Sequence, residues 1–183
     1  MQITSTAIPD VKIISPRRFA DARGYFCETY TNRAWQAAGM DVGFVQDNES
    51  LSVQKGVVRG LHYQIPPVAQ AKLVRVLCGA ILDVAVDIRR GSPTFGRQMS
   101  VVISAADGRQ VFIPPGFAHG YLTLEANTLI SYKVSDYYAP TCDRGIRWND
   151  PALGIDWGVD EERAILSDRD RLHPLLKDAT DLF

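Results

Sequence analysis

Short β-branched runs follow one another through the middle of the chain, with turn residues between them. Segments 72–78 (KLVRVLC) and 81–88 (ILDVAVDI) are separated only by Gly79-Ala80, which is the spacing of a hairpin. Further strands are expected at 98–104, 110–113, 117–124 and 127–134. The breaks GSPTFG, AADG and PPG have the composition of turns. Many short strands at regular intervals predict a mainly β fold, a barrel or sandwich of the jelly-roll kind.

The strand at 81–88 is expected to have two unlike faces, because successive side chains point to opposite sides of a sheet. Asp83 and Asp87 share one face. The other face carries Leu82, Val84, Val86 and Ile88. One side of this strand is therefore apolar and the other carries two carboxylates.

Helices are expected to be few. Residues 31–38 predict one short helix, with Thr31 as its N-cap and Gly39 as its stop. The chain after Trp148 is rich in loop residues, and short helical turns are expected around 160–166 and 172–177. We expect a single domain over residues 1–183, because this length suits one domain with a real core.

The composition is that of a globular protein, with 46% hydrophobic and 22% charged residues. Twenty basic and twenty-one acidic side chains give a formal net charge of -1. A chain without a basic field is not expected to bind nucleic acid, and an anionic ligand would be held by local arginines. The three cysteines, Cys27, Cys78 and Cys142, are expected to be reduced thiols. The N-terminus lacks a signal-peptide pattern and no apolar run is long enough to span a bilayer, so a cytoplasmic protein without membrane contact is expected.

The chain has only three histidines. The spacing Gly108-x5-Pro114-x-Gly116-x2-His119 resembles the second motif of cupins, which predicts a cupin-type jelly-roll barrel. The first cupin motif normally supplies two histidines and a glutamate as metal ligands, but this chain has His62-Tyr63-Gln64 there. Two separated histidines make a poor transition-metal site, so no metal and no cofactor are expected. His173, in RLHPLL, is expected in a surface loop.

His62 is the candidate general base, because an unperturbed imidazole has a pKa near 6.5. Three other residues would complete a proton-transfer set with it: Arg59, three residues before it, Lys72, at the start of the next strand, and Tyr132, in an otherwise apolar strand. The alternative is a core histidine bonded to backbone. In a flat strand Arg59 and His62 would point to opposite faces, and a bulge at Gly60 would bring them together. Otherwise Arg59 would serve a second site.

Three arginines are candidate ligands for a diphosphate, namely Arg23, Arg59 and Arg169. The alternative for each is a solvated surface charge. No glycine-rich phosphate loop is present, so side chains and aromatic stacking would have to hold a nucleotide. Tyr137-Tyr138 offers a stacking platform, although a tyrosine pair at the end of a strand is also ordinary packing.

Taken together, eight motifs cover nearly the whole chain. They are DxRGYFxE (21–28), FVQDNES (44–50), VVRGLHYQ (57–64), AKLVRVL (71–77), DVAVDIRRGSPTFG (83–96), IPPGFAHGYL (113–122), SYKVSDYYAP (131–140) and LSDRD (166–170). With these motifs the chain resembles the dTDP-4-dehydrorhamnose 3,5-epimerase family of the dTDP-L-rhamnose pathway. The resemblance implies a homodimer.

The resemblance also implies a role for each matching residue. His62 would be the base, Asp170 the carboxylate that orients it, Tyr132 the acid on the opposite face of the sugar, and Lys72 the cation for the enolate oxygen. Tyr138 would stack on thymine. The rest of the nucleotide-sugar site would be lined by Arg23, Glu28, Gln46, Asp47, Asn48, Glu49, Arg59, His119, Asp143 and Arg169. The family often has glutamate at position 143 and lysine at 169, so the reach of those two contacts differs here.

The implied chemistry agrees with the residue types. Carbons 3 and 5 of a 4-keto-6-deoxysugar both flank the ketone, so loss of either proton gives an enolate that a cation stabilises. Inversion then needs an acid on the other face, and a tyrosine suits that role. The expected reaction converts dTDP-4-dehydro-6-deoxy-D-glucose to dTDP-4-dehydro-L-rhamnose. Three alternatives stay open: a single-carbon epimerase or keto-isomerase, a metal-dependent cupin oxygenase, and a non-catalytic sugar-nucleotide binding cupin.

Overall fold

A computed structural model describes all residues from 1 to 183, and most of its regular structure is strand. The strands are β1 (Gln2–Ser5), β2 (Lys12–Ser15), β3 (Arg18–Asp21), β4 (Gly24–Cys27), β5 (Gln46–Ser52), β6 (Val58–Gln64), β7 (Lys72–Cys78), β8 (Ala80–Asp87), β9 (Gln98–Ser104), β10 (Gln110–Ile113), β11 (Phe117–Thr123), β12 (Thr128–Val134) and β13 (Asp143–Gly145). The helices are α1 (Asn32–Ala37) and α2 (Asp168–Leu172), with 3-10 turns η1 (Pro151–Leu153) and η2 (Leu176–Asp178). The mainly β composition expected from the sequence is confirmed.

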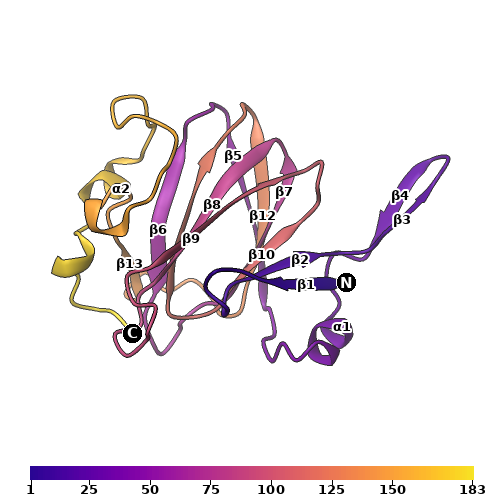
Figure 1. Cartoon of the computed structure of the whole chain (residues 1–183), viewed down its shortest axis with the longest axis horizontal. Helices are drawn as coiled ribbons and strands as arrows, with labels where there is room; N and C mark the ends of the chain where they lie inside the picture. Colours follow the sequence, from indigo (N-terminus) through magenta and orange to yellow (C-terminus); the bar gives the residue numbers. More distant parts are fainter.

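Two antiparallel sheets face each other and enclose the core. One has the order β1-β2-β10-β7-β12-β5 and the other the order β13-β6-β11-β8-β9. Figure 1 shows β6, β8 and β9 on one side of this interior and β5, β7 and β12 on the other. Val74 and Ile130 of the first sheet pack against Ala85 and Tyr121 of the second. This is the jelly-roll architecture that the strand pattern and the cupin-like spacing predicted.

The expected hairpin of β7 and β8 is wrong, although both strands form close to the predicted residues. β7 belongs to the six-stranded sheet and β8 to the five-stranded sheet, so the chain crosses between sheets at Gly79. The Gly79 carbonyl accepts from the Ala105 amide, and Ala80 pairs with Ser104 on β9. The turn's backbone groups are therefore satisfied by β9, and a two-residue connection serves as a corner of the sandwich.

The first helix is confirmed and the C-terminal turns are partly corrected. The Thr31 hydroxyl accepts from the Ala34 amide, which caps α1 as expected. Residues 160–166 form no helix. The helix begins later because Ser167 caps α2, and η2 overlaps the predicted turn at 172–177 only at its end. None of the helices has both the length and the apolar composition needed to cross a membrane.

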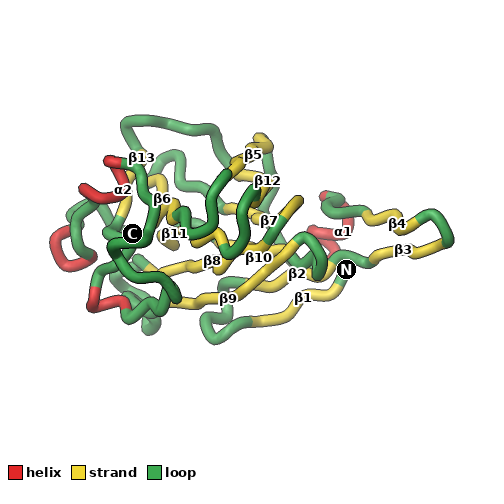
Figure 2. The backbone as a smooth tube through the Cα atoms, turned by 90° about the horizontal axis from the view of Figure 1, so that it is seen from above, coloured by secondary structure: helices red, strands yellow, loops and turns green.

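The C-terminal segment covers the outer face of the five-stranded sheet. Trp148, Trp157 and Leu176 pack against Val84 and Val86 of β8. Figures 1 and 2 show this part of the chain beside β6 and β13. Because the aliphatic face of β8 is turned outward onto this cover, its acidic face is turned into the barrel. The two faces of this strand are thus confirmed.

Candidate active site

A cavity of about 650 Å³ lies between the two sheets. β5, β7 and β12 supply one wall, β6 and β11 the other, and α2 covers one side. Its polar lining includes Arg59, His62, Lys72, His119, Tyr132 and Asp170. His119 and Tyr132 point inward because successive side chains of a strand alternate between its two faces. The cavity brings together all four residues expected to be catalytic.

His62 and Asp170 form the shortest contact in this cavity. His62 Nε2 lies 2.6 Å from Asp170 Oδ1, and the carboxylate is buried. Asp170 belongs to the first turn of α2, where its amide donates to the Ser167 hydroxyl at 3.1 Å. A carboxylate accepts only, so Nε2 carries the proton and the lone pair is on Nδ1. The pair thus holds His62 in the tautomer of a base.

The surroundings keep this pair as a neutral imidazole beside an anion. Burial lowers the pKa of His62, and Asp170 only partly offsets this, while Lys72 and His173 lower it further. Burial alone would raise the pKa of Asp170, but its contacts with His173 and His62 outweigh burial and hold that pKa below its usual range. Near pH 7 the base is therefore free to accept a proton.

Lys72 and Tyr132 supply a cation and an acid from the opposite sheet. Desolvation lowers the pKa of Lys72 to about 8, with Asp143 and Asp83 opposing that shift. Its ammonium is mostly protonated near pH 7 and donates to the His62 carbonyl at 3.3 Å. Burial raises the pKa of Tyr132, so its phenol keeps its proton. One wall thus carries a neutral imidazole, and the other wall carries a protonated phenol and an ammonium group.

A bulge at Gly60 turns Arg59 and His62 to the same face. On β11, His119 opposes His62 and Tyr121 opposes Arg59, so β6 holds one more residue over this interval than its partner. Gly60 has φ +137°, and a Cβ there would come 2.5 Å from the Gly120 Cα. Only glycine fits this position. The Arg59 guanidinium enters the cavity and donates to Ser52 Oγ at 3.3 Å and to the Leu51 carbonyl at 3.2 Å.

A second histidine–carboxylate pair lies on the same wall as His62. His119 Nε2 is 2.9 Å from Asp83 Oδ2, and both side chains are buried. Asp83 Oδ1 has no hydrogen-bond partner in the protein. From the sequence, Asp83 was expected on the acidic face of its strand, and no functional role was predicted for it. The sequence sign of a role for Asp83 was a carboxylate within a largely aliphatic strand. A buried carboxylate is stable only where a hydrogen-bonding or charged partner contacts it.

The expectation that His173 lies in a surface loop is wrong. Its side chain is buried, and Nε2 lies 3.6 Å from Asp170 Oδ1. Its ring stands edge-on to the His62 ring with centroids 5.4 Å apart. The residue follows the last turn of α2 directly, and that turn directs its ring toward Gly145 of β13. A helix too short to give a periodic sequence pattern thus places this side chain next to Asp170.

His62, Asp170 and His173 offer three potential metal ligand atoms within 4.8 Å of one another. Ligands bound to one ion at about 2.0–2.2 Å stand roughly 3 Å or more apart. The His62–Asp170 separation of 2.6 Å is shorter than that and is the length of a charge-assisted hydrogen bond. The chemistry of this donor set therefore fits a shared proton rather than a shared cation.

The rim of the site carries three of the expected nucleotide-binding residues. Arg169 of α2 lies 2.7 Å from Asp143 Oδ2, and the Tyr138 hydroxyl donates to the same oxygen at 2.9 Å. A smaller recess of about 210 Å³ adjoins them and is lined by Gln46 and Asn48 of β5. The Arg169–Asp143 pair keeps opposite charges in contact at the rim of the cavity.

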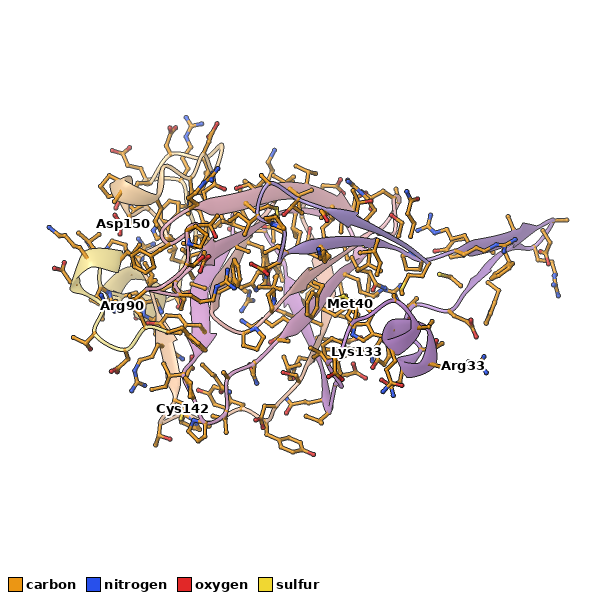
Figure 3. All side chains as sticks on the ribbon, turned by 60° about the horizontal axis from the view of Figure 1, so that its bottom comes forward. Arg33, Met40, Arg90, Lys133, Cys142 and Asp150 are labelled. Atoms are coloured by element: carbon orange, nitrogen blue, oxygen red, sulfur yellow. The ribbon has the colours of Figure 1, made fainter.

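Four of the expected site residues lie away from the cavity within this chain. Asp47 and Glu49 alternate with the inward-facing positions of β5 and point outward, where Asp47 pairs with Lys133 at 2.7 Å. Arg23 and Glu28 belong to the β3–β4 hairpin and its exit, and this hairpin projects from the barrel (Figures 1 and 3). Arg23 pairs there with Asp21, and its side chain is 90% exposed.

Comparison with known proteins accounts for almost the whole chain. The model of the family described as dTDP-4-dehydrorhamnose 3,5-epimerase matches residues 5–178. A protein of Sinorhizobium fredii with that name is 51% identical over 176 residues, covering 96% of this chain and 90% of its own length.

Solved structures agree with this assignment. The epimerase of Legionella pneumophila, crystallised with dTDP-4-keto-L-rhamnose, has a TM-score of 0.92 at 46% identity, with 98% of this chain and 94% of that chain covered. A 3'-monoepimerase of Streptomyces bikiniensis, in complex with dTDP-quinovose, has a TM-score of 0.86 at 36% identity, with 94% and 87% covered. On the strength of the family match and of these identities, this chain belongs to the dTDP-4-dehydrorhamnose 3,5-epimerase family.

Proposed function

We propose that this chain epimerises dTDP-4-dehydro-6-deoxy-D-glucose at carbons 3 and 5 to give dTDP-4-dehydro-L-rhamnose, a step of dTDP-L-rhamnose biosynthesis. The observation that carries the proposal is the His62–Asp170 pair at 2.6 Å, with Lys72 and Tyr132 across the same cavity. A base and an acid on opposite walls are what inversion at a carbon requires. The names of the relatives supply the substrate class.

Each epimerisation is a proton transfer in two halves. His62 Nδ1 takes the proton from the carbon beside the ketone, and the electron pair of that C–H bond forms a carbon–carbon double bond. The ketone oxygen becomes an enolate oxygen, which the Lys72 ammonium stabilises. The Tyr132 hydroxyl then gives its proton to the opposite face of the same carbon, and the ketone re-forms. Exchange with water returns a proton to Tyr132 and removes one from His62.

Asp170 contributes by stabilising the imidazolium that forms during this transfer. Its carboxylate already accepts from Nε2, so the positive charge develops beside an oriented anion and little reorganisation is needed. The group at the rim, Tyr138, Asp143 and Arg169, would bind the nucleotide, with Tyr138 stacking on thymine. Gln46, Asn48, Arg59 and His119 would complete the site.

We propose that the working form is a homodimer in which the β3–β4 hairpin reaches a partner. Three large apolar side chains of the hairpin are exposed: Phe19 (48%), Tyr25 (57%) and Phe26 (66%). An isolated two-stranded hairpin is marginal in water, so a projecting one with an apolar surface calls for a cover. A partner's cavity would then receive Arg23 and Glu28, which lie far from the cavity of their own chain.

We also propose a cytoplasmic location. Its support is the chemistry of the three free cysteines, Cys27, Cys78 and Cys142, none of which is paired.

The deciding experiment is NMR of the purified protein with the dTDP-4-keto sugar in D2O. We expect deuterium at both carbons 3 and 5, together with appearance of the L-rhamno product. The single-carbon alternative is supported by the likeness to a 3'-monoepimerase, and deuterium at one carbon alone would establish it.

Turnover abolished by a chelator would favour the metal-dependent alternative. Neither exchange nor product with the folded parent would leave only a binding protein. A folded His62→Ala variant with unchanged turnover would refute the role of His62 as the base; we expect a loss of at least about 100-fold.

A further inference from the structure

We propose that His173 is a positioning residue for the His62–Asp170 pair, restricting the Asp170 carboxylate from a second direction. The part of this inference that concerns catalysis rests on the proposed function. Its structural part concerns the ligand-free protein and is tested independently.

The first support is that the buried Nε2 of His173 has one nearby acceptor, the Asp170 carboxylate. Its side chain is 8% exposed, and Nε2 makes no hydrogen bond within the protein. Asp170 Oδ1 lies 3.6 Å from it, and this is the oxygen that accepts from His62. A buried imidazole nitrogen without a partner costs free energy. The nearby Asp170 carboxylate is the group that offsets this cost for His173.

The second support is that the ring is held from behind. A Cβ at Gly145 would overlap the imidazole carbons and nitrogen of His173, so the ring packs directly on the backbone of β13. The Arg147 guanidinium donates to the His173 carbonyl at 3.2 Å, and its amide donates to the Pro174 carbonyl at 2.8 Å. His173 is thereby fixed to β13, the strand whose Gly145 pairs with His62 in the sheet.

Asp170 Oδ1 therefore faces two imidazoles, and the backbone of β13 supports one of them and pairs with the strand that carries the other. Without His173 the carboxylate would have a free side and would turn away from the geometry that orients His62. An error of about 1 Å in such a group can cost roughly 100-fold in rate. His173 also weakens the hold of Asp170 on the His62 proton, because it faces the same oxygen.

Many charged groups surround the two histidines, so the test compares variants in which these neighbouring residues are unchanged. His62 faces Asp170 and His173 on the C-terminal side and shares its cavity with Arg59, Lys72, His119, Tyr132 and Arg169. The recess beside His173 contains Asp143, Arg144, Arg169, Asp178 and Asp181, with Tyr63 below them. Apart from His173 itself, none of these groups is altered in the variants that follow.

The experiment compares His173→Leu, His173→Gln and, as a matched control, Arg171→Leu. Leucine keeps the bulk of the ring and removes the donor, whereas glutamine keeps an N–H near the position of Nε2. Arg171 is an exposed charge on the same helix. The first readout is the NMR titration of the His62 imidazole in ligand-free protein, and the second is kcat and KM across pH.

For His173→Leu we expect the His62 titration to move to lower pH, because a carboxylate that turns away from Nε2 no longer raises the pKa of His62, and the opposing effect of losing His173 is the smaller of the two. A base with a lowered pKa stays neutral to lower pH, so the acidic limb of the kcat profile moves in the same direction. We expect kcat to fall about 10-fold with KM nearly unchanged, as for other groups that orient a catalytic residue. His173→Gln should restore most of kcat, and Arg171→Leu should match the parent.

An unmoved His62 titration and a kcat within twofold of the parent in His173→Leu would overturn the inference. Equal loss in the leucine and glutamine variants would also overturn it, because packing alone would then explain the effect. If the leucine variant does not fold, Gly145→Ala displaces the ring while keeping His173, and the same two shifts are expected. If the parent shows no turnover of the dTDP-4-keto sugar while the titration still moves, the proposed function fails and the positioning of Asp170 stands.

Discussion

Replacing Asp170 with asparagine isolates the charge of the carboxylate from its shape. The lost interaction is a hydrogen bond of 2.6 Å from His62 Nε2 to a buried anion. A hydrogen bond to a charged group contributes about 1.5–3 kcal/mol. Since about 1.4 kcal/mol is tenfold in rate, kcat should fall roughly 10- to 150-fold. An amide N–H facing Nε2 would impose the wrong tautomer and deepen the loss, as in catalytic triads.

The pH profile supplies a second and independent expectation for this variant. Asp170 raises the pKa of His62, so removing its charge lets that pKa fall further below the usual value. A base with a lower pKa stays neutral to lower pH. The acidic limb of kcat should therefore move to lower pH, in the same direction as the shift expected for His173→Leu.

The assay is deuterium incorporation and product formation by NMR across pH, with Asp168→Asn as the control. Asp168 is an exposed carboxylate in the first turn of the same helix, so its loss should leave both quantities unchanged. An Asp170→Asn variant with kcat within threefold of the parent would refute the role of the charge. So would an acidic limb that moves to higher pH.

Three further substitutions test other parts of the site and fold. Tyr132→Phe should spare deuterium exchange more than product formation, because the base remains and the acid is lost; equal loss of both would count against an acid role. Asp83→Asn should lower kcat about tenfold by freeing His119, and should move the alkaline limb to lower pH, because Asp83 raises the pKa of Lys72. Asp87→Asn should cost about 3 kcal/mol in urea unfolding at pH 7, since the buried carboxylate accepts from Arg89 and two hydroxyls. The pKa of Asp87 lies below its unfolded value, so this stability is present above that value, near pH 4, and is lost as pH falls; a parent without such loss in acid would exclude this account.

Much of the local structure could be predicted from the sequence, because strand alternation, turn residues and caps act over a few neighbours. The six strands expected between residues 72 and 134 form within a residue of their expected bounds, and Thr31 caps α1; β13 was not expected. The faces of β8 follow from a period of two. His62, His119 and Tyr132 could be proposed for the site because each lies on a strand with a recognisable motif.

Only the tertiary structure decided which strands pair and which side chains meet. The two residues between β7 and β8 fit a hairpin and a corner equally well, and pairing with β9 selects the corner. Gly60 allowed a bulge, but the close approach of Gly120 is what requires one. His173 was expected at the surface because a five-residue helix has too few turns to show its buried face in a sequence pattern. Its partner Asp170 lies 108 positions from His62, and such contacts depend on how the sheets and their C-terminal cover pack, which no local pattern encodes.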